Sequence, residues 1–369
     1  MSSLLRSFFS VCLLPFSLLY GIGVAIRNLL FELHVLKSTQ FPIPVICVGN
    51  ITVGGTGKTP HTEYLIQLLE QEFNIAVLSR GYKRKSKGFV LASSHTAVDQ
   101  LGDEPYQMKK KFPDIHMAVD RDRCHGIEEL TAPENGLAID VILLDDAFQH
   151  RYVKPGLSVV LIDYNRPIYS DLLLPAGRLR EPASGKKRAD ILVVTKCPET
   201  ITPEEQMRIR KRLNPKAGQE LYFTQFAYGD LYQLTSQATR RAIQSLAKDS
   251  EILLVTGIAS PLSLINKLSA YTANIHPLTF PDHHDFTEED VQLIRQKFEQ
   301  LSPGKRLIIT TEKDAARLTG HPSMTNDLKE NTYVLPIKVA FLNQSDQSFN
   351  QKIIEYVRQN SRNSGLLKK

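Results

Sequence analysis

Cysteine is scarce in this sequence, and the spacing of the four thiols excludes two classes of site. Cys12, Cys47, Cys124 and Cys197 lie far apart, and no two of them form a C-x-x-C pair. Neither a zinc cluster nor a disulfide framework fits that spacing. We therefore expect a reducing compartment, with the four cysteines acting as small buried side chains.

Internal repeats and low-complexity tracts are also missing from the 369 residues. The chain is 42% hydrophobic and 23% charged, as in ordinary globular proteins, and it is long enough for two domains. Its net charge of +6 indicates an acidic partner. Since no aromatic–basic RNA-binding signature accompanies that charge, we expect no nucleic acid partner, which leaves a phosphorylated substrate or anionic lipid.

Charge is absent from one long N-terminal segment, the run between Arg6 and Arg27. This apolar run reaches the roughly 20 residues that a membrane span requires, although Pro15 and Gly21 interrupt it. We expect residues 1–36 to form a helix that associates with the inner leaflet, either spanning it or lying on it. A buried core helix and a signal peptide are the alternatives, and the nucleotide motif described below argues against export.

Short apolar runs recur along the rest of the chain. They occupy residues 45–48, 75–78, 141–144, 159–162 and 191–194, and then 252–255, 307–309 and 333–335. Continuous runs of this kind are typical of strands buried on both faces, and the helical stretches between them favour a mostly parallel sheet. We predict an α/β fold with a P-loop NTPase-like core at 37–220, helices on both faces of its sheet, and a smaller α/β domain at 221–369.

The clearest motif is V-I-C-V-G-N-I-T-V-G-G-T-G-K-T-P at residues 45–60. Its glycines let backbone N–H groups approach phosphates, Lys58 can reach the β- and γ-phosphates, and the Thr59 hydroxyl can ligate Mg²⁺. In the strict G-x-x-x-x-G-K-[ST] pattern the first glycine would stand at Thr52, so the loop is a variant. The alternative is a plain glycine-rich turn. The predicted nucleotide-binding residues are Thr52, Val53, Gly54, Gly55, Thr56, Gly57, Lys58 and Thr59.

A second motif ends another apolar strand with two carboxylates, Asp145 and Asp146. This is the form of a Walker B strand, whose acid holds Mg²⁺ directly or through water. Adjacent side chains on a strand point to opposite sides, so we expect only one of the two to touch the metal shell. Gln149 follows and is expected to line the nucleotide pocket. Without the phosphate loop, the same pair would suit a solvated strand end.

Several further motifs occur in a fixed order with these two. They are S-R-G-Y at 79–82, G-D-E-P at 102–105, L-D-D-A-F-Q-H at 144–150, L-P-A-G-R-L-R-E-P at 174–182, V-T-K at 194–196, V-T-G-I-A-S-P at 255–261, D-H-H at 282–284 and T-E-K-D-A at 311–315. The set resembles the tetraacyldisaccharide 4'-kinase family of lipid A synthesis over nearly the whole chain. Family members commonly carry glycine where Ala147 stands and proline where Arg178 stands, and neither difference removes a chemical group.

The resemblance implies transfer of the ATP γ-phosphate, with Mg²⁺, to the 4'-hydroxyl of an acylated glucosamine disaccharide 1-phosphate. It also implies a peripheral inner-membrane enzyme that faces the cytoplasm and contacts membrane lipids. The alternative is a membrane-associated regulatory P-loop NTPase, which hydrolyses nucleotide without an acceptor.

The resemblance further implies roles for residues that spacing alone leaves open. Asp103 and His283 match the family's catalytic pair, which act with Lys58, while Arg121, Arg180 and Glu181 match residues around the transferred phosphate. From the residues alone, Gly102-Asp103 also suits a turn or helix cap, and D-H-H also suits a metal site or a loop. Because Asp103 and His283 fall in different predicted domains, catalysis would require domain closure.

Overall fold

A computed structural model describes residues 3–258, 261–282 and 284–366, and the chain divides into two compact units. Unit 1 comprises residues 1–101, 108–226 and 339–369, and unit 2 comprises 102–107 and 227–338. The second unit is therefore shorter than the predicted domain at 221–369. The chain returns to unit 1 from Val339 onward, where the Tyr356 hydroxyl bonds to the backbone N and O of Val45, at 3.2 Å each.

Unit 1 is built on a nine-stranded sheet of order β15-β8-β7-β6-β1-β5-β2-β4-β3. The strands are β1 (Val45–Asn50), β2 (Ile75–Ser79), β3 (Val90–Leu91), β4 (His116–Val119), β5 (Val141–Asp145), β6 (Leu157–Asp163), β7 (Ile191–Thr195), β8 (Glu220–Tyr228) and β15 (Ile337–Phe341). The pairings from β4 through β8 are parallel, and β3 runs antiparallel to β4. Because β1 lies between β5 and β6, the loops after β1 and β5 leave the same edge of the sheet.

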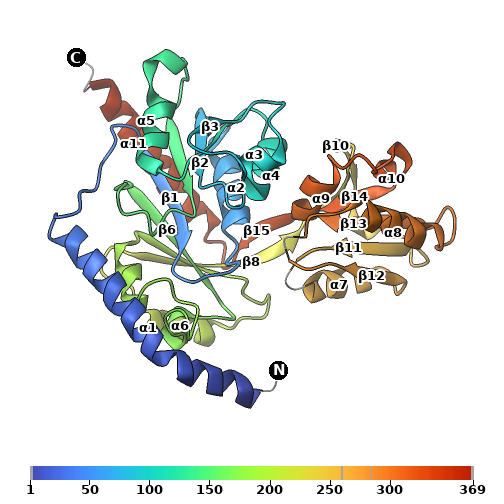
Figure 1. The fold of residues 1–369 in the computed structure, drawn as a ribbon, viewed down its shortest axis with the longest axis horizontal. Helices are drawn as coiled ribbons and strands as arrows, with labels where there is room; N and C mark the ends of the chain where they lie inside the picture. Colours follow the sequence, from blue (N-terminus) through green and yellow to red (C-terminus); the bar gives the residue numbers. More distant parts are fainter. Residues whose placement is uncertain (1–2, 259–260, 283, 367–369) are drawn as a thin grey trace. The chain divides into compact units, whose positions relative to one another are not determined.

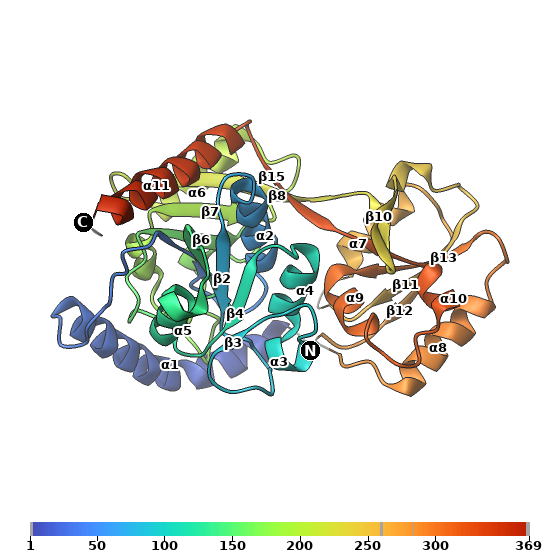
Figure 2. The same cartoon turned by 90° about the horizontal axis from the view of Figure 1, so that it is seen from above.

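Helices lie on both sides of this sheet (Figure 1). They are α1 (Ser3–Glu32), α2 (Lys58–Leu69), α3 (Val98–Leu101), α4 (Asp103–Lys111, which begins in unit 2), α5 (Arg123–Thr131), α6 (Pro203–Leu213) and α11 (Asp346–Leu366). Figure 2 shows α1 and α11 on opposite sides of unit 1. α2 packs against α11, where the Tyr64 ring meets Phe349 and its hydroxyl donates to Asn350 at 2.8 Å.

Unit 2 has its own six-stranded sheet of order β10-β9-β14-β13-β11-β12. Its strands are β9 (Leu231–Gln233), β10 (Ser236–Arg241), β11 (Glu251–Thr256), β12 (Ile275–Thr279), β13 (Arg306–Thr311) and β14 (Thr332–Leu335), and its helices are α7 (Leu262–Ser269), α8 (Glu288–Glu299), α9 (Glu312–Leu318) and α10 (Asn326–Glu330). The four strands β11 to β14 are parallel, while β9 and β10 are antiparallel.

The predicted apolar runs all form central strands, and their side chains make up the hydrophobic cores. Among the unpredicted strands, β3 and β9 are short and β12, which contains Pro277, is half-exposed, whereas β8 has nine residues and none of them is exposed. Cys47 and Cys197 are buried as expected, whereas Cys12 is exposed and Cys124 is half-buried. The exposed thiol lies on α1, whose outward face is apolar rather than polar.

Candidate active site

The phosphate loop connects the buried strand β1 to the N-terminus of α2. Gly54 and Gly57 have φ of 98° and 90°, in the left-handed region that glycine adopts without strain. A Cβ on Gly57 would lie 2.5 Å from the Phe226 ring, so the ring would have to shift to admit a larger side chain. The backbone N–H groups of the loop and of the first turn of α2 thus form an anion site of the kind that binds phosphate.

Thr52 occupies the position where the strict motif has its first glycine, and the structure gives the reason. Thr52 forms an antiparallel bridge with Leu179, flanked by hydrogen bonds from Val53 N to Arg178 O and from Arg180 N to Ile51 O, both 2.8 Å. The backbone is extended here, and a β-branched residue suits extended chain better than glycine does. The substitution therefore ties the phosphate loop to the segment that carries Arg180.

The end of β7 supports the loop from the other side. Thr195 Oγ1 donates to Thr56 O at 2.8 Å, and Lys196 Nζ donates to Gly55 O and pairs with Asp163 at 2.8 Å. This end of β7 is the V-T-K motif at 194–196. These contacts assign Thr195 and Lys196 to holding the carbonyl side of the loop, which directs its N–H groups away from them.

His61, in the first turn of α2, fixes the end of the same loop. Its Nδ1 lies 2.8 Å from Gly57 O and its Nε2 lies 3.1 Å from Thr224 Oγ1. Since a carbonyl only accepts, Nδ1 carries the proton. Burial lowers the pKa of His61 to about 4, although the bond to Gly57 O opposes this shift. A neutral imidazole therefore holds the loop at physiological pH.

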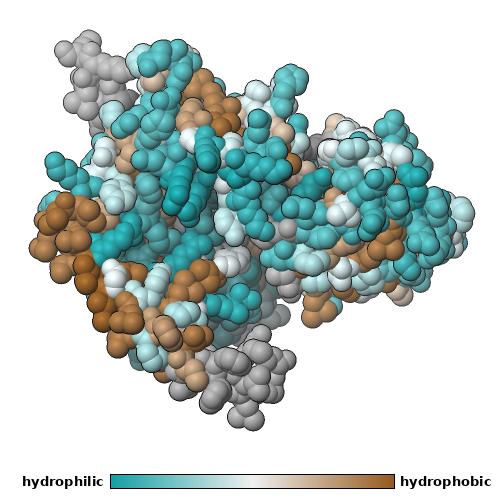
Figure 3. All heavy atoms as spheres, viewed as in Figure 1, coloured by the Kyte–Doolittle hydropathy of each residue, from teal (hydrophilic) through white to brown (hydrophobic). Residues whose placement is uncertain are grey.

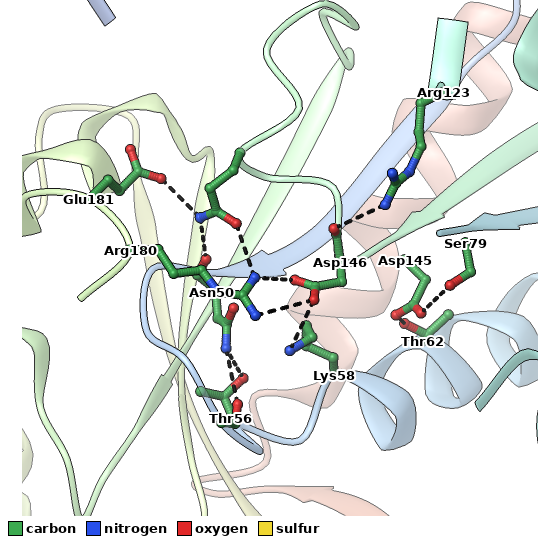
Figure 4. A network of polar contacts seen from close by, with 12 residues as sticks. Asn50, Thr56, Lys58, Thr62, Ser79, Arg123, Asp145, Asp146, Arg180 and Glu181 are labelled. Atoms are coloured by element: carbon green, nitrogen blue, oxygen red, sulfur yellow. Dashed lines mark hydrogen bonds and ion pairs between the residues drawn. The ribbon is translucent and has the colours of Figure 1, made fainter. Parts of the chain in front are cut away.

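The two acidic residues at the end of β5 have different surroundings (Figure 4). Asp145 is buried and accepts hydrogen bonds from Ser79 Oγ at 3.1 Å and Thr62 Oγ1 at 3.4 Å. Burial, reinforced by the neighbouring Asp146 charge, raises the pKa of Asp145. Hydroxyl groups hold Asp145, whereas cations surround Asp146.

Asp146 adopts a positive φ of 48° and turns its carboxylate toward the phosphate loop. Lys58 Nζ lies 3.6 Å from Oδ2, and Arg180 Nη1 donates to Oδ1 at 3.0 Å. Burial opposes the charge of Asp146, but Lys58 and Arg180 outweigh it and keep the pKa of this carboxyl below its usual value. Two cations and one carboxylate therefore meet beside the loop.

Gln149 and Glu181 extend this network behind Arg180. Gln149 accepts from Arg180 Nη1 at 3.2 Å, and its Nε2 donates to Asn50 O at 2.7 Å and to Glu181 Oε1 at 3.0 Å. Glu181 is buried and forms a bidentate pair with Arg188, at 2.7 and 3.0 Å. Glu181 thus binds Gln149 and Arg188, and Arg180 is the member of this network that contacts Asp146.

The structure separates Arg121 from a neighbour that the sequence did not single out. Arg121 is exposed, and only its backbone carbonyl has a described contact here, with Arg123 Nη1 at 3.0 Å. Arg123 itself is buried and donates to Asp146 O at 3.3 Å, as Figure 4 shows. The helix-capping residue Asp122 could have indicated Arg123, because Asp122 caps α5 and orients the residue that follows it.

Asp103 and His283, the expected catalytic pair, are only partly described. Asp103 begins α4 and groups with unit 2, where it accepts from Arg317 Nε at 3.1 Å and also pairs with Nη2. Arg317 Nη1 also donates to His284 O at 3.0 Å. His283 lies outside the described residues. Arg317, which the sequence did not single out, therefore joins Asp103 to the D-H-H segment.

The donor set beside the loop fits a hard divalent cation. Thr59, Asp145 and Asp146 offer hydroxyl and carboxylate oxygens, the ligands that Mg²⁺ prefers. Asn50 is fully buried, and its Oδ1 has no hydrogen-bond partner within the described part of the chain. Oxygen donors, two flexible cations and a ring of N–H groups together can bind a nucleotide triphosphate with its metal.

Comparison with known proteins shows which family this chain resembles. The family model described as tetraacyldisaccharide-1-P 4'-kinase matches residues 9–358. A tetraacyldisaccharide 4'-kinase of Phocaeicola vulgatus is 58% identical over 354 residues, 96% of this chain and 97% of its own, and one of Bacteroides fragilis is 53% identical over 96% and 95%. The crystal structure of the "apo" form of LpxK from Aquifex aeolicus in complex with ATP has a TM-score of 0.72 and 31% identity, covering 95% of this chain and 99% of that one.

Proposed function

This chain belongs to the tetraacyldisaccharide-1-P 4'-kinase family, and we propose on that premise how its own residues perform the reaction. The reaction is ATP-dependent transfer of the γ-phosphate to the 4'-hydroxyl of tetraacyldisaccharide 1-phosphate, which gives the 1,4'-bisphosphate. The observation that carries the assignment is the meeting of Lys58, Arg180 and Asp146 beside the phosphate loop.

On the donor side, the N–H groups of residues 54–59 bind the β- and γ-phosphates, and Lys58 neutralises the charge that develops on transfer. Asp146 holds Lys58 and Arg180 within reach of the loop. Arg180 then turns toward the transferred phosphoryl group. Thr59 and one carboxylate of the Asp145–Asp146 pair would hold Mg²⁺, which would neutralise part of the phosphate charge.

On the acceptor side, Asp103 takes the proton of the attacking hydroxyl, with His283 as its partner from the D-H-H segment. Arg317 supports this role because a bidentate guanidinium fixes the carboxylate in one orientation. Burial opposes the charge on Arg317, but Asp103 outweighs it, so the pKa of the guanidinium is raised and it stays protonated.

The acylated substrate reaches the enzyme at a lipid surface, and α1 provides the contact. Its segment Cys12–Glu32 is long and apolar enough to cross a membrane. Its outward face carries Phe16, Leu18, Leu19, Ile22, Ile26 and Leu29, each at least 47% exposed. Figure 3 shows an apolar band where Figure 1 draws α1. Since one side of α1 packs on unit 1, we propose that the helix lies in the interface of the inner leaflet rather than spanning it.

The test is incubation of the purified chain with ATP, Mg²⁺ and tetraacyldisaccharide 1-phosphate in mixed micelles. We expect a bisphosphorylated lipid, resolved by mass spectrometry, that needs all three components. Lys58→Ala should abolish it, while the thiol variant Cys47→Ala serves as a control for handling. Hydrolysis of ATP to ADP at the same rate with and without the lipid would favour a regulatory NTPase and contradict the assignment.

A further inference from the structure

The helix α1 has a docked face as well as an exposed one. Its less exposed residues recur at intervals of three and four, which places them on one side of the helix: Ser17, Gly21, Val24, Asn28 and Phe31. Ser17 and Phe31 are more than 90% buried, while Leu18 and Leu19 are about two-thirds exposed. The same helix therefore presents one side to its own protein and the other to its surroundings.

The docked face binds the segment that leads to Arg180. Ser17 Oγ donates to Leu173 O at 3.0 Å and accepts from Ala176 N at 2.9 Å. A Cβ on Gly21 would lie 2.8 Å from the Leu173 side chain, so the helix backbone approaches this segment closely. Such paired backbone contacts fix the position of the segment along the helix axis.

One turn further, α1 reaches the residue that pairs with Asp146. The Tyr20 hydroxyl donates to Arg180 O at 2.7 Å, and the Arg180 side chain binds Asp146 and Gln149. Arg180 N is itself bonded to Ile51 O in the phosphate loop. Both backbone polar groups of Arg180 are thereby held, one by the phosphate loop and the other by α1.

A second contact reaches the same network through Gln149. Arg27 Nη2 donates to Gln149 O at 3.0 Å, and the Gln149 side chain contacts Arg180 and Glu181. The Arg27 guanidinium is itself held over the Phe31 ring, 5.3 Å from its centroid. Arg27 interrupts the apolar helix at the point where a cation is needed to bind this carbonyl.

We propose that Tyr20 and Arg27 of α1 are positioning residues for phosphoryl transfer: they hold the backbones of Arg180 and Gln149 so that the Arg180 guanidinium stays at the phosphate site. This rests on the proposed function in one respect, the role of Arg180 at the transferred phosphoryl group. The membrane-facing helix is then a structural part of the phosphate site, because losing its docked face frees Arg180 to leave the site.

The first test compares two Tyr→Phe variants that each lose one hydroxyl hydrogen bond of similar length. Tyr20→Phe loses the 2.7 Å bond to Arg180 O, and the control Tyr64→Phe loses the 2.8 Å bond to Asn350, on the side of α2 that faces α11. In micelles, we expect Tyr20→Phe to lower kcat about 3- to 10-fold with an unchanged KM for the lipid. Tyr64→Phe should keep the wild-type kcat. Equal kcat values for the two variants would overturn the proposal.

The second test is a double-mutant cycle with Arg180→Ala, which shows whether Tyr20 acts through that side chain. If it does, Tyr20→Phe has no further effect on kcat once the guanidinium is gone. A merely structural role would instead give the same fold-loss in both backgrounds, and this result would refute the inference. Arg27→Lys, which keeps a donor for Gln149 O, should retain more kcat than Arg27→Gln, and the reverse order would count against the proposal.

Measuring ATP affinity for the same variants separates this inference from the assignment of the reaction. If the wild-type chain binds ATP–Mg²⁺ but forms no bisphosphate, the proposed function fails. The positioning role then still stands if the effects of Tyr20→Phe and Arg180→Ala on ATP affinity are non-additive. It is refuted if those two effects are additive. Liposome sedimentation should give equal recovery for Tyr20→Phe and the wild type, and a loss of recovery that accounts for the fall in kcat would contradict the proposal.

Discussion

The phosphate loop contains three glycines whose replacement by alanine separates backbone strain from steric overlap. Gly55 has an ordinary backbone, and a Cβ there meets nothing within 4 Å. Gly54 has a φ of 98°, and its nearest neighbour, Arg166, would be 3.7 Å from a Cβ. Gly57 combines a φ of 90° with a Cβ position 2.5 Å from Phe226. Alanine therefore introduces neither strain nor overlap at Gly55, backbone strain alone at Gly54, and both strain and overlap at Gly57.

These differences set the expected order of stability. Placing alanine in the left-handed region costs about 1–2 kcal/mol, so Gly54→Ala should lose roughly that amount. The overlap with Phe226 adds about 1–3 kcal/mol, which gives about 2–5 kcal/mol for Gly57→Ala. Gly55→Ala should be neutral or slightly stabilising, because alanine reduces the freedom of the unfolded chain. A loss of 1 kcal/mol lowers Tm by about 2–4 °C in a unit of this size.

Calorimetric scans of the full chain, with ATP titrations below the transition, measure both effects. We expect Gly57→Ala to lower Tm most and to bind ATP most weakly. Removing the overlapping ring with Phe226→Leu should bring the loss in Gly57→Ala back toward that of Gly54→Ala. If all three alanine variants unfold at the same temperature and bind ATP equally well, the loop does not have the strained geometry on which the anion site depends.

Three further outcomes are expected. Because His61 has a pKa of about 4 when folded and about 6.5 when unfolded, stability is full above pH 6.5 and falls by up to about 3 kcal/mol as the pH drops toward 4; urea unfolding should show this slope in the wild type and lose it in His61→Gln. Asp103→Asn should lower kcat about 10²- to 10⁴-fold while ATP affinity stays within twofold, and wild-type kcat would refute the base assignment. Leu18→Asp with Leu19→Asp should reduce recovery on anionic liposomes, as measured by sedimentation, without changing ATP affinity; unchanged recovery would exclude this face of α1 as the lipid contact.

Much of the fold follows from local sequence because the central strands are buried on both faces. The runs 45–48 and 141–144 could be recognised as strands since nothing but apolar residues suits such an environment. Edge and connecting elements carry weaker signals. The strand β15 and the helix α11 belong to unit 1 through contacts such as that of Tyr356 with Val45, which no local pattern specifies.

The site residues also divide into those that local sequence predicts and those whose contacts only the fold shows. Motif spacing was enough to predict the phosphate loop, Lys58 and the acidic pair as the nucleotide site, because the chemistry of phosphate and magnesium binding requires those residue types next to one another in the chain. Glu181 was identified through the resemblance, but only the fold shows that it pairs with Arg188 instead of pointing to the phosphate site.

The sequence by itself therefore determined the class of protein, the nucleotide site and the apolar character of the N-terminal helix. Only the tertiary structure decided that Arg123 is the buried cation near Asp146, that Thr52 bridges to Leu179, and that Tyr20 of α1 binds Arg180. The physical reason is that these contacts join residues 23 to 160 positions apart, and hydrogen bonds across such separations depend on how the strands and helices pack.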